Sequence, residues 1–185
     1  MLEPTAPTVE RVTKLDAIRR QLRAAIQLFF EQRDNVPTYT LAAAVQELLR
    51  DLLRPRGQGS FSKDSDWIRP ERRKDFLELM NRPQNFFKHA DRDPGAVLEF
   101  NPKTLEYVLL DCALMYQAYT GRGLREGWVF FVWFSSTYPD LLVSGPFKDA
   151  LLTAYEKLGA PLDKRLVREL LDQTKFWSDF ASNFD

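Results

Sequence analysis

Apolar residues recur every three or four positions along most of this chain, the spacing that places side chains on one face of an α-helix. One such run covers residues 9–33, and after the sequence DNVPTY a second begins, for which we expect Thr38 or Thr40 to be the N-cap. Further helices are predicted over 69–81, with Pro70 in the first turn, and over 103–119, where glycine ends the helix. Two more runs, 145–159 and 163–184, close the chain.

The segment 125–137, REGWVFFVWFSST, has a less clear pattern. Its aromatic and β-branched residues are typical of a strand, but the chain contains no second clear strand that could pair with it. We therefore predict a buried helix here.

These runs together predict an all-α fold, a single-domain helical bundle of about six to eight helices that spans residues 1–185. Residues 1–8 are expected to fray, and 55–66, rich in Gly, Pro, Ser and charge, to form a flexible surface loop. Between the third and fourth helices, Val97, Leu98 and Phe100 are expected to form a short extended piece packed on the core.

The charge balance restricts the kind of partner. The chain has 26 Lys and Arg against 26 Asp and Glu, which excludes the strong basic excess of general nucleic-acid binders. Any contact with a nucleic acid must therefore be local. The single cysteine, the start without a secretory signal and the absence of a run of about 20 apolar residues predict a cytoplasmic protein with no membrane partner.

Several classes of site can be excluded by counting. One histidine and one cysteine cannot build a multi-histidine or cysteine-rich zinc site, and no glycine-rich phosphate loop is present, so we expect no cofactor. Cys112 could be a nucleophile served by His89, but its neighbours VLLDCALM favour a small buried packing residue.

A metal site is a further alternative at His89, Asp91 and Asp93. A calcium loop beginning at Asp91 would need glutamate at its twelfth position, which is Pro102. The two aspartates more simply bond to local backbone N–H groups, so we expect no bound metal.

The only histidine lies in the stretch NRPQNFFKHAD, residues 81–91. If residues 82–90 form one helix, Arg82, Asn85 and His89 fall within an arc of roughly 60°. The neighbouring Lys88 and Arg92 add positive charge. Four other residues of the stretch are then expected to face the core: Pro83, Phe86, Phe87 and Ala90.

This polar row has a useful chemistry. Imidazole exchanges a proton near neutral pH, guanidinium holds a phosphate with two hydrogen bonds, and an amide can orient either group. A base that activates a 2′-hydroxyl and an arginine that stabilises the phosphorane suffice to cleave RNA without metal, leaving a cyclic phosphate.

An Arg followed by a His after a short spacer that contains a polar residue, in a compact helical bundle, resembles the signature of HEPN domains. The resemblance rests on RPQNFFKH and on the all-helical pattern of the rest. It implies catalytic roles for His89 and Arg82 and a supporting role for Asn85, with Lys88 and Arg92 contacting nucleic acid. It also implies metal-independent ribonuclease activity or RNA binding, and a homodimer in which two motifs meet.

Two other interpretations stay open. His89 and Asn85 can be ordinary residues at a helix end, with the nearby charges only solvating a face. Alternatively, the chain can be a non-catalytic helical interaction module whose surface is aromatic, formed by Trp128, Phe131, Trp133 and Phe134.

Overall fold

The computed structural model describes residues 9–64, 69–91, 93–141, 144 and 162–172. In these residues it contains six α-helices, two short 3-10 turns and no strand, which confirms the all-α fold. None of the described helices has both the length and the apolar character needed to cross a bilayer. The prediction of a helix over 145–159 falls outside the described residues, as do the expected frayed start and residues 173–184 of the last predicted helix.

Helix α1, Lys14–Phe30, begins with a capping box in which the Thr13 hydroxyl accepts from the Asp16 N–H and the Asp16 carboxylate accepts from the Thr13 N–H. Helix α2, Asn35–Leu53, begins earlier than predicted. Its N-cap is Asp34, whose carboxylate accepts from the Val36 N–H at 2.8 Å, so the prediction of a threonine cap is wrong. The hydroxyls of Thr38 and Thr40 instead donate to the Asp34 and Val36 carbonyls inside the helix.

The second half of the bundle follows the predicted pattern closely. Helix α4, Lys103–Thr120, ends at Gly121, whose positive φ of 70° suits a residue without a Cβ. Helix α5, Arg125–Thr137, confirms that the ambiguous aromatic segment is helical. Helix α7, Lys164–Asp172, packs against α1 and α5, where the Lys164 ammonium lies 3.6 Å from the centroid of the Phe29 ring.

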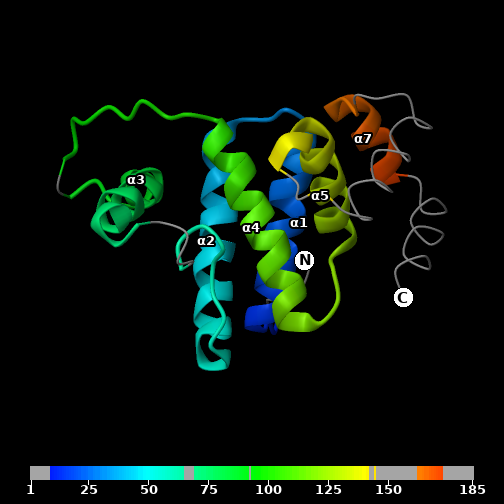
Figure 1. The fold of residues 1–185 in the computed structure, drawn as a ribbon, viewed down its shortest axis with the longest axis horizontal. Coiled ribbons are helices and arrows are strands. Elements are labelled where there is room, and N and C mark those ends of the chain that lie inside the picture. The colour runs from blue at the N-terminus through cyan, green and yellow to red at the C-terminus, as the bar shows by residue number, and fades with distance from the viewer. Residues whose placement is uncertain (1–8, 65–68, 92, 142–143, 145–161, 173–185) are drawn as a thin grey trace, which may run out of the picture.

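The core lies where α1, α2, α4 and α5 meet. Helix α2 runs between α1 and α4 and packs on both, and Figure 1 shows the four helices side by side. Phe29, Phe30, Phe130 and Trp133 pack with ring centroids 4.9 to 6.1 Å apart and are all buried. Because α1, α4 and α7 pack against α5, the apolar run 127–134 is stable in a helix here.

Helix α3, Pro70–Lys88, lies apart from this bundle, beside α2 (Figure 1). The chain then returns to α4 through residues 93–102, which contain no regular structure. Within the predicted extended piece, Phe100 packs at 5.2 Å from the Tyr39 ring, whereas Val97 is 86% exposed. The prediction of core packing therefore holds for Phe100 and is wrong for Val97.

Candidate functional site

The predicted polar row lies at the C-terminal end of α3. Pro70 occupies the first turn, where a missing N–H costs nothing, and Pro83 lies inside the helix without ending it. Pro83 and Gln84 are buried, whereas Arg82 and Asn85 are exposed. The helix is therefore oriented so that the arginine and the amide face solvent.

His89 does not continue the helix. It is the C-cap residue, with an extended backbone, and its N–H donates to the Asn85 carbonyl at 3.0 Å. The prediction of one helix over 82–90 is therefore wrong beyond Lys88. The imidazole is 61% exposed, and its Nδ1 lies 4.0 Å from the Asp91 carboxylate.

The three residues of the row thus lie at one end of α3, but their side chains do not bind each other. Within the described residues, no hydrogen bond or ion pair joins the side chains of Arg82, Asn85 and His89. Lys88 is exposed in the last turn, and Arg92 lies outside the described residues. The exposed side chains of Arg82, Asn85 and Lys88 keep their donors and acceptors available for a ligand.

The apolar side of the row anchors α3. Phe87 packs edge-on against Tyr39 and Phe100, at 5.8 and 5.5 Å, and Phe86 is half-buried beside Phe87. The Tyr39 hydroxyl also donates to the Met80 carbonyl. Ala90 is exposed, so its predicted place in the core is wrong.

The alternative sites find less support. Cys112 is fully buried and its thiol donates to the Ala42 carbonyl, as expected of a packing residue. Burial raises the pKa of this thiol well above its usual value, which disfavours a thiolate nucleophile. Among the residues that the structure describes, no three His, Cys, Asp or Glu side chains lie together in a way that could hold a metal ion.

The proposed aromatic surface does not exist as predicted. Trp133 and Phe134 are 5% and 4% exposed and belong to the core, because α5 turns this side toward α1 and α4. Trp128 and Phe131 lie on the other side of α5 and are half-buried.

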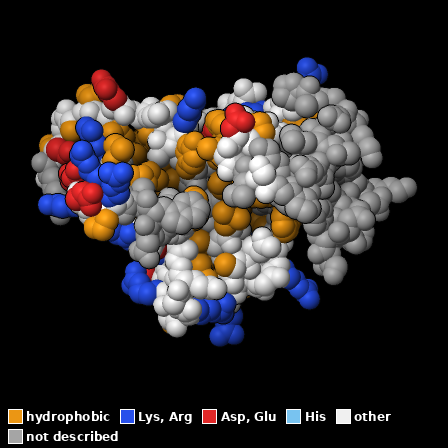
Figure 2. Space-filling model, in the orientation of Figure 1, with side chains coloured by type: hydrophobic (Ala, Val, Ile, Leu, Met, Phe, Trp, Pro, Cys, Tyr) orange, Lys and Arg blue, Asp and Glu red, His pale blue; other side chains and the backbone are white. Residues whose placement is uncertain are grey.

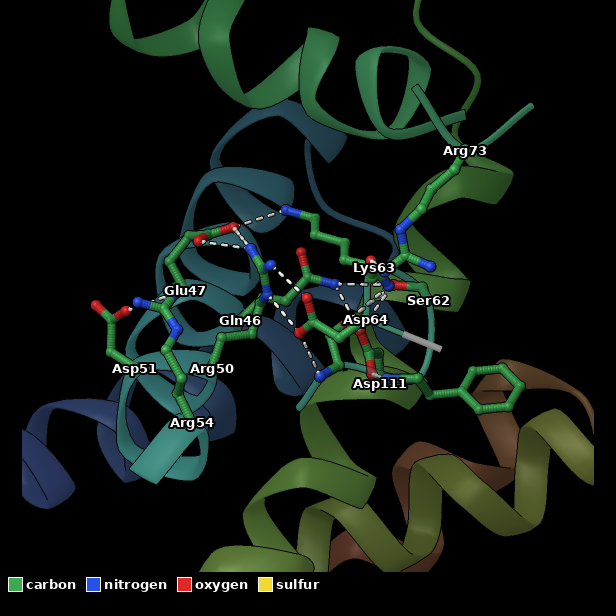
Figure 3. A network of polar contacts seen from close by, with 12 residues as sticks. Gln46, Glu47, Arg50, Asp51, Arg54, Ser62, Lys63, Asp64, Arg73 and Asp111 are labelled. Carbon is green, nitrogen blue, oxygen red and sulfur yellow. Dashed lines mark hydrogen bonds and ion pairs between the residues drawn. The ribbon is translucent and has the colours of Figure 1, made fainter. Parts of the chain in front are cut away.

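A buried polar cluster at the centre of the molecule was not predicted (Figure 3). The Asp111 carboxylate on α4 is 1% exposed and accepts four hydrogen bonds. The donors are the Gln46 amide, the Ser60 and Ser62 hydroxyls and the Phe61 N–H, at 2.5 to 2.8 Å. This cluster, which we call the Asp111 cluster, fixes part of the connection between α2 and α3 onto α4.

Charged pairs extend this attachment. Arg50 on α2 makes two hydrogen bonds to the Asp64 carboxylate, at 2.6 and 2.8 Å, and also pairs with Glu47. The hydrogen bond from Arg50 lowers the pKa of Asp64. Burial raises the pKa of Glu47, but the hydrogen bond and charge of Lys63 together with Arg50 outweigh it, so the pKa of Glu47 is lowered.

Lys63 links this region to α3. Its side chain is 1% exposed, and its ammonium donates to Glu47 at 2.7 Å and to the Gln84 amide oxygen at 3.4 Å. The Lys63 carbonyl accepts from the Arg73 guanidinium of α3. The prediction of a surface loop over 55–66 is therefore wrong for the buried residues Ser60 and Lys63. These contacts set the rotation of α3 and hence the direction of the row.

Comparison of the chain with family models, with curated proteins and with solved structures found no match.

Proposed function

We propose that the C-terminal turns of α3 bind RNA, and that the protein is a HEPN-like, metal-independent ribonuclease. The observation that carries this proposal is the exposure of Arg82, Asn85 and His89 at one end of one helix, with no side-chain contact among the three.

The local charge of α3 supports a phosphate ligand. Residues 79–88, the last turns of α3, carry the basic side chains of Arg82 and Lys88 and no acidic one, although the whole chain has no net charge. The acidic side chains are Glu71, Asp75 and Glu78, and at about 100° per residue they lie on the same side as Arg82. RNA is therefore expected to contact only the last turns, near Arg82 and Lys88.

Each residue has a distinct role in the proposed reaction. His89 accepts the proton of a 2′-hydroxyl, whose oxygen then attacks the adjacent phosphorus. Arg82 holds the phosphate and stabilises the charge of the phosphorane, and Asn85 orients the imidazole or the hydroxyl. The bond to the 5′-oxygen breaks, the 5′-oxygen takes a proton from water, and a 2′,3′-cyclic phosphate remains.

The test is cleavage of varied RNAs in EDTA. The wild-type protein is expected to cleave, His89→Ala to lose activity, and Gln27→Ala, an exposed change on α1, to retain it. Circular dichroism of all three proteins checks that the fold is intact. If the wild type cleaves no RNA, the proposal of a ribonuclease is wrong. If it also binds no RNA, the proposal that α3 binds RNA is wrong as well.

A further inference from the structure

Helices α2 and α4 end side by side at one end of the bundle. They run parallel, since Gln46 on α2 bonds to Asp111 on α4 and, further along both, Arg56 donates to the Tyr119 carbonyl. Figure 1 shows both helices ending at the lower end of the molecule. The last carbonyls of a helix carry a partial negative charge, so two such ends attract basic side chains.

The chain places arginines and no acidic residue around these two helix ends. Residues 52–59 and 112–125 contain no Asp or Glu. The arginines of the two segments form a surface that we call the arginine end: Arg54, Arg56, Arg122 and Arg125. Lys and Arg side chains predominate over acidic ones at the lower end of Figure 2. Because the whole chain has no net charge, this surface is a local concentration of positive charge.

The protein itself neutralises little of this charge. Arg54 and Arg125 form only loose ion pairs, at 3.5 and 3.8 Å. In the part of the chain that the structure describes, no carboxylate pairs with Arg56 or Arg122. The two acidic side chains near the start of α1, which lies at the same end, are each paired with another arginine at 2.6 Å. The arginine end is therefore able to bind an anion.

Arg56 is held in a fixed orientation. Its guanidinium carbon lies 4.2 Å from the centroid of the Tyr119 ring, and its Nη1 donates to the Tyr119 carbonyl at 2.7 Å. Within the described residues, Nε and Nη2 make no hydrogen bond. A guanidinium binds phosphate through two parallel N–H groups, and one that is already fixed loses less conformational entropy on binding. The edge formed by Nε and Nη2 is therefore prepared for a phosphate.

Arg122 is placed by the turn that ends α4. The Thr120 hydroxyl donates to the Arg122 carbonyl at 2.6 Å and accepts from the Arg122 N–H at 3.2 Å. The Arg122 side chain is exposed, and it bonds to no other described residue. All of its donors are therefore available to a ligand.

The RNA proposed to bind α3 needs contacts elsewhere on the protein. On α3 it reaches only the last turns, where Arg82 and Lys88 can neutralise about two phosphates, and affinity rises with each phosphate contact. The row lies beside the first half of α2, since Phe87 packs at 5.8 Å from the Tyr39 ring. At 1.5 Å per residue, the arginine end lies about 25 Å further along α2. A stacked strand with a phosphate every 3.4 Å covers this distance in about seven nucleotides.

We propose that the arginine end binds the phosphate backbone of the RNA whose scissile bond lies at the row on α3. The choice of RNA as the ligand rests on the proposed function. Contacts to phosphate carry no sequence information, so this surface adds affinity for any RNA long enough to reach both places. It takes no part in the chemical step, and a dinucleotide is too short to use it.

Charge reversal tests the surface, with fluorescence anisotropy of a labelled RNA of about 20 nucleotides. Arg56→Glu and Arg122→Glu are each expected to weaken binding by about tenfold. Arg168→Glu, the same change at an exposed arginine of α7, is the control and should change the affinity by less than about twofold, because α7 packs on α1 and α5. Circular dichroism checks the fold, and Arg122 is the decisive position because its side chain supports no other residue. Unchanged affinity in Arg122→Glu would overturn the proposal.

The salt dependence of binding counts the phosphate contacts. Arg122→Gln removes one such contact, so the slope of log affinity against log salt concentration should fall by about 0.7. A slope equal to that of the wild type would contradict a phosphate ligand at Arg122. Poly-glutamate that binds as tightly as the RNA, and that the same substitutions displace, would assign the surface to acidic protein segments and overturn the proposal.

Two comparisons separate this proposal from the role of α3. Arg122→Glu should raise KM for the long RNA by about tenfold without changing kcat, and it should leave cleavage of a dinucleotide unchanged. If Arg82→Ala weakens RNA binding and Arg122→Glu does not, the arginine end is wrong and the proposal for α3 stands. If only Arg122→Glu weakens binding, the arginine end stands and the RNA contact of α3 is wrong. If the wild type binds no RNA, both proposals are wrong.

Discussion

The Asp111 cluster and the polar row on α3 are both polar, but their surroundings are opposite. The Asp111 carboxylate is 1% exposed and accepts four hydrogen bonds. Arg82, Asn85 and His89 are exposed, and none of their side chains contacts another member of the row. Burial of a polar group is costly unless it is paired, whereas an exposed group is paired by water that a ligand can replace.

The difference separates two roles of polar residues in this protein. The cluster holds the connection between α2 and α3 in place, and through Lys63 and Gln84 it orients the helix that carries the row. The row contributes little to this packing and is free to bind. Substitutions in the cluster should therefore change stability, and substitutions in the row should change activity alone.

The largest effect is expected for Asp111→Ala. The change leaves four donors, two of them buried, without their acceptor, and it should lower the free energy of unfolding by about 3–5 kcal/mol. Urea denaturation followed by circular dichroism measures this loss. The free energy of unfolding of Asp111→Asn should lie between those of the wild type and Asp111→Ala, since the amide keeps one acceptor oxygen. A loss below about 1 kcal/mol would show that the cluster is not a major source of stability.

A smaller loss, about 2 kcal/mol, is expected for Lys63→Met. Methionine fills a similar volume but leaves the buried Gln84 oxygen without the Lys63 donor. Hydrogen exchange should become faster in α3, because its link to α2 is lost. Lys74→Met, an exposed change on α3, is the control and should alter neither quantity. If hydrogen exchange in α3 is unchanged, Lys63 does not orient the helix that carries the row.

Arg82→Ala is expected to weaken RNA binding by about tenfold, or about 1.4 kcal/mol, without changing stability by more than about 0.5 kcal/mol. Arg82→Lys should recover part of the affinity, since it keeps the charge but not the paired hydrogen bonds. Fluorescence anisotropy with a labelled RNA measures the affinity of both variants. Arg33→Ala, at another exposed arginine, which follows α1 and pairs with Glu31, should have no effect. An equal loss in the Arg33 variant would indicate only general attraction to charge.

The smallest effect concerns pH. The hydrogen bond from Arg50 lowers the pKa of Asp64 below 3.8, so the stabilisation is present above this value and is lost as the pH falls through the folded-state pKa. Asp64→Asn should therefore be less stable than the wild type at pH 7, by under about 1 kcal/mol since the pair is partly exposed to water. The difference should narrow below pH 4, as urea denaturation at several pH values would show. A difference that grows in acid would contradict this assignment.

The sequence predicted most of the helices because their stability comes from amphipathic faces, which repeat locally. Even the strand-like segment 125–137 was predicted as a helix, from the lack of any partner strand. The start of α2 was missed because DNVPTY contains a proline, although Pro37 lies in the first turn, where its missing N–H is harmless.

The Asp111 cluster was missed for a different reason. Its members are far apart in the chain, since Asp111 and Ser60 are 51 positions apart, and the serine- and glycine-rich segment has the composition of a surface loop. Only the packing of α2 on α4 buries these side chains. The sequence left the placement of His89 open, since the helix predicted over 82–90 ends at Lys88 and His89 is its exposed C-cap residue. The buried side of α5 was not predicted, since residues 127–134 of that helix are all apolar and give no contrast between its sides.

The 3′ ends of RNA fragments test the central assignment most directly. After incubation of RNA with the wild-type protein in EDTA, mass spectrometry is expected to find 2′,3′-cyclic phosphates, together with fragments that begin with a 5′-hydroxyl. This chemistry requires attack by the 2′-oxygen, which is the step assigned to His89 and Arg82. Fragments with a 3′-hydroxyl and a 5′-phosphate, or intact RNA, would contradict it.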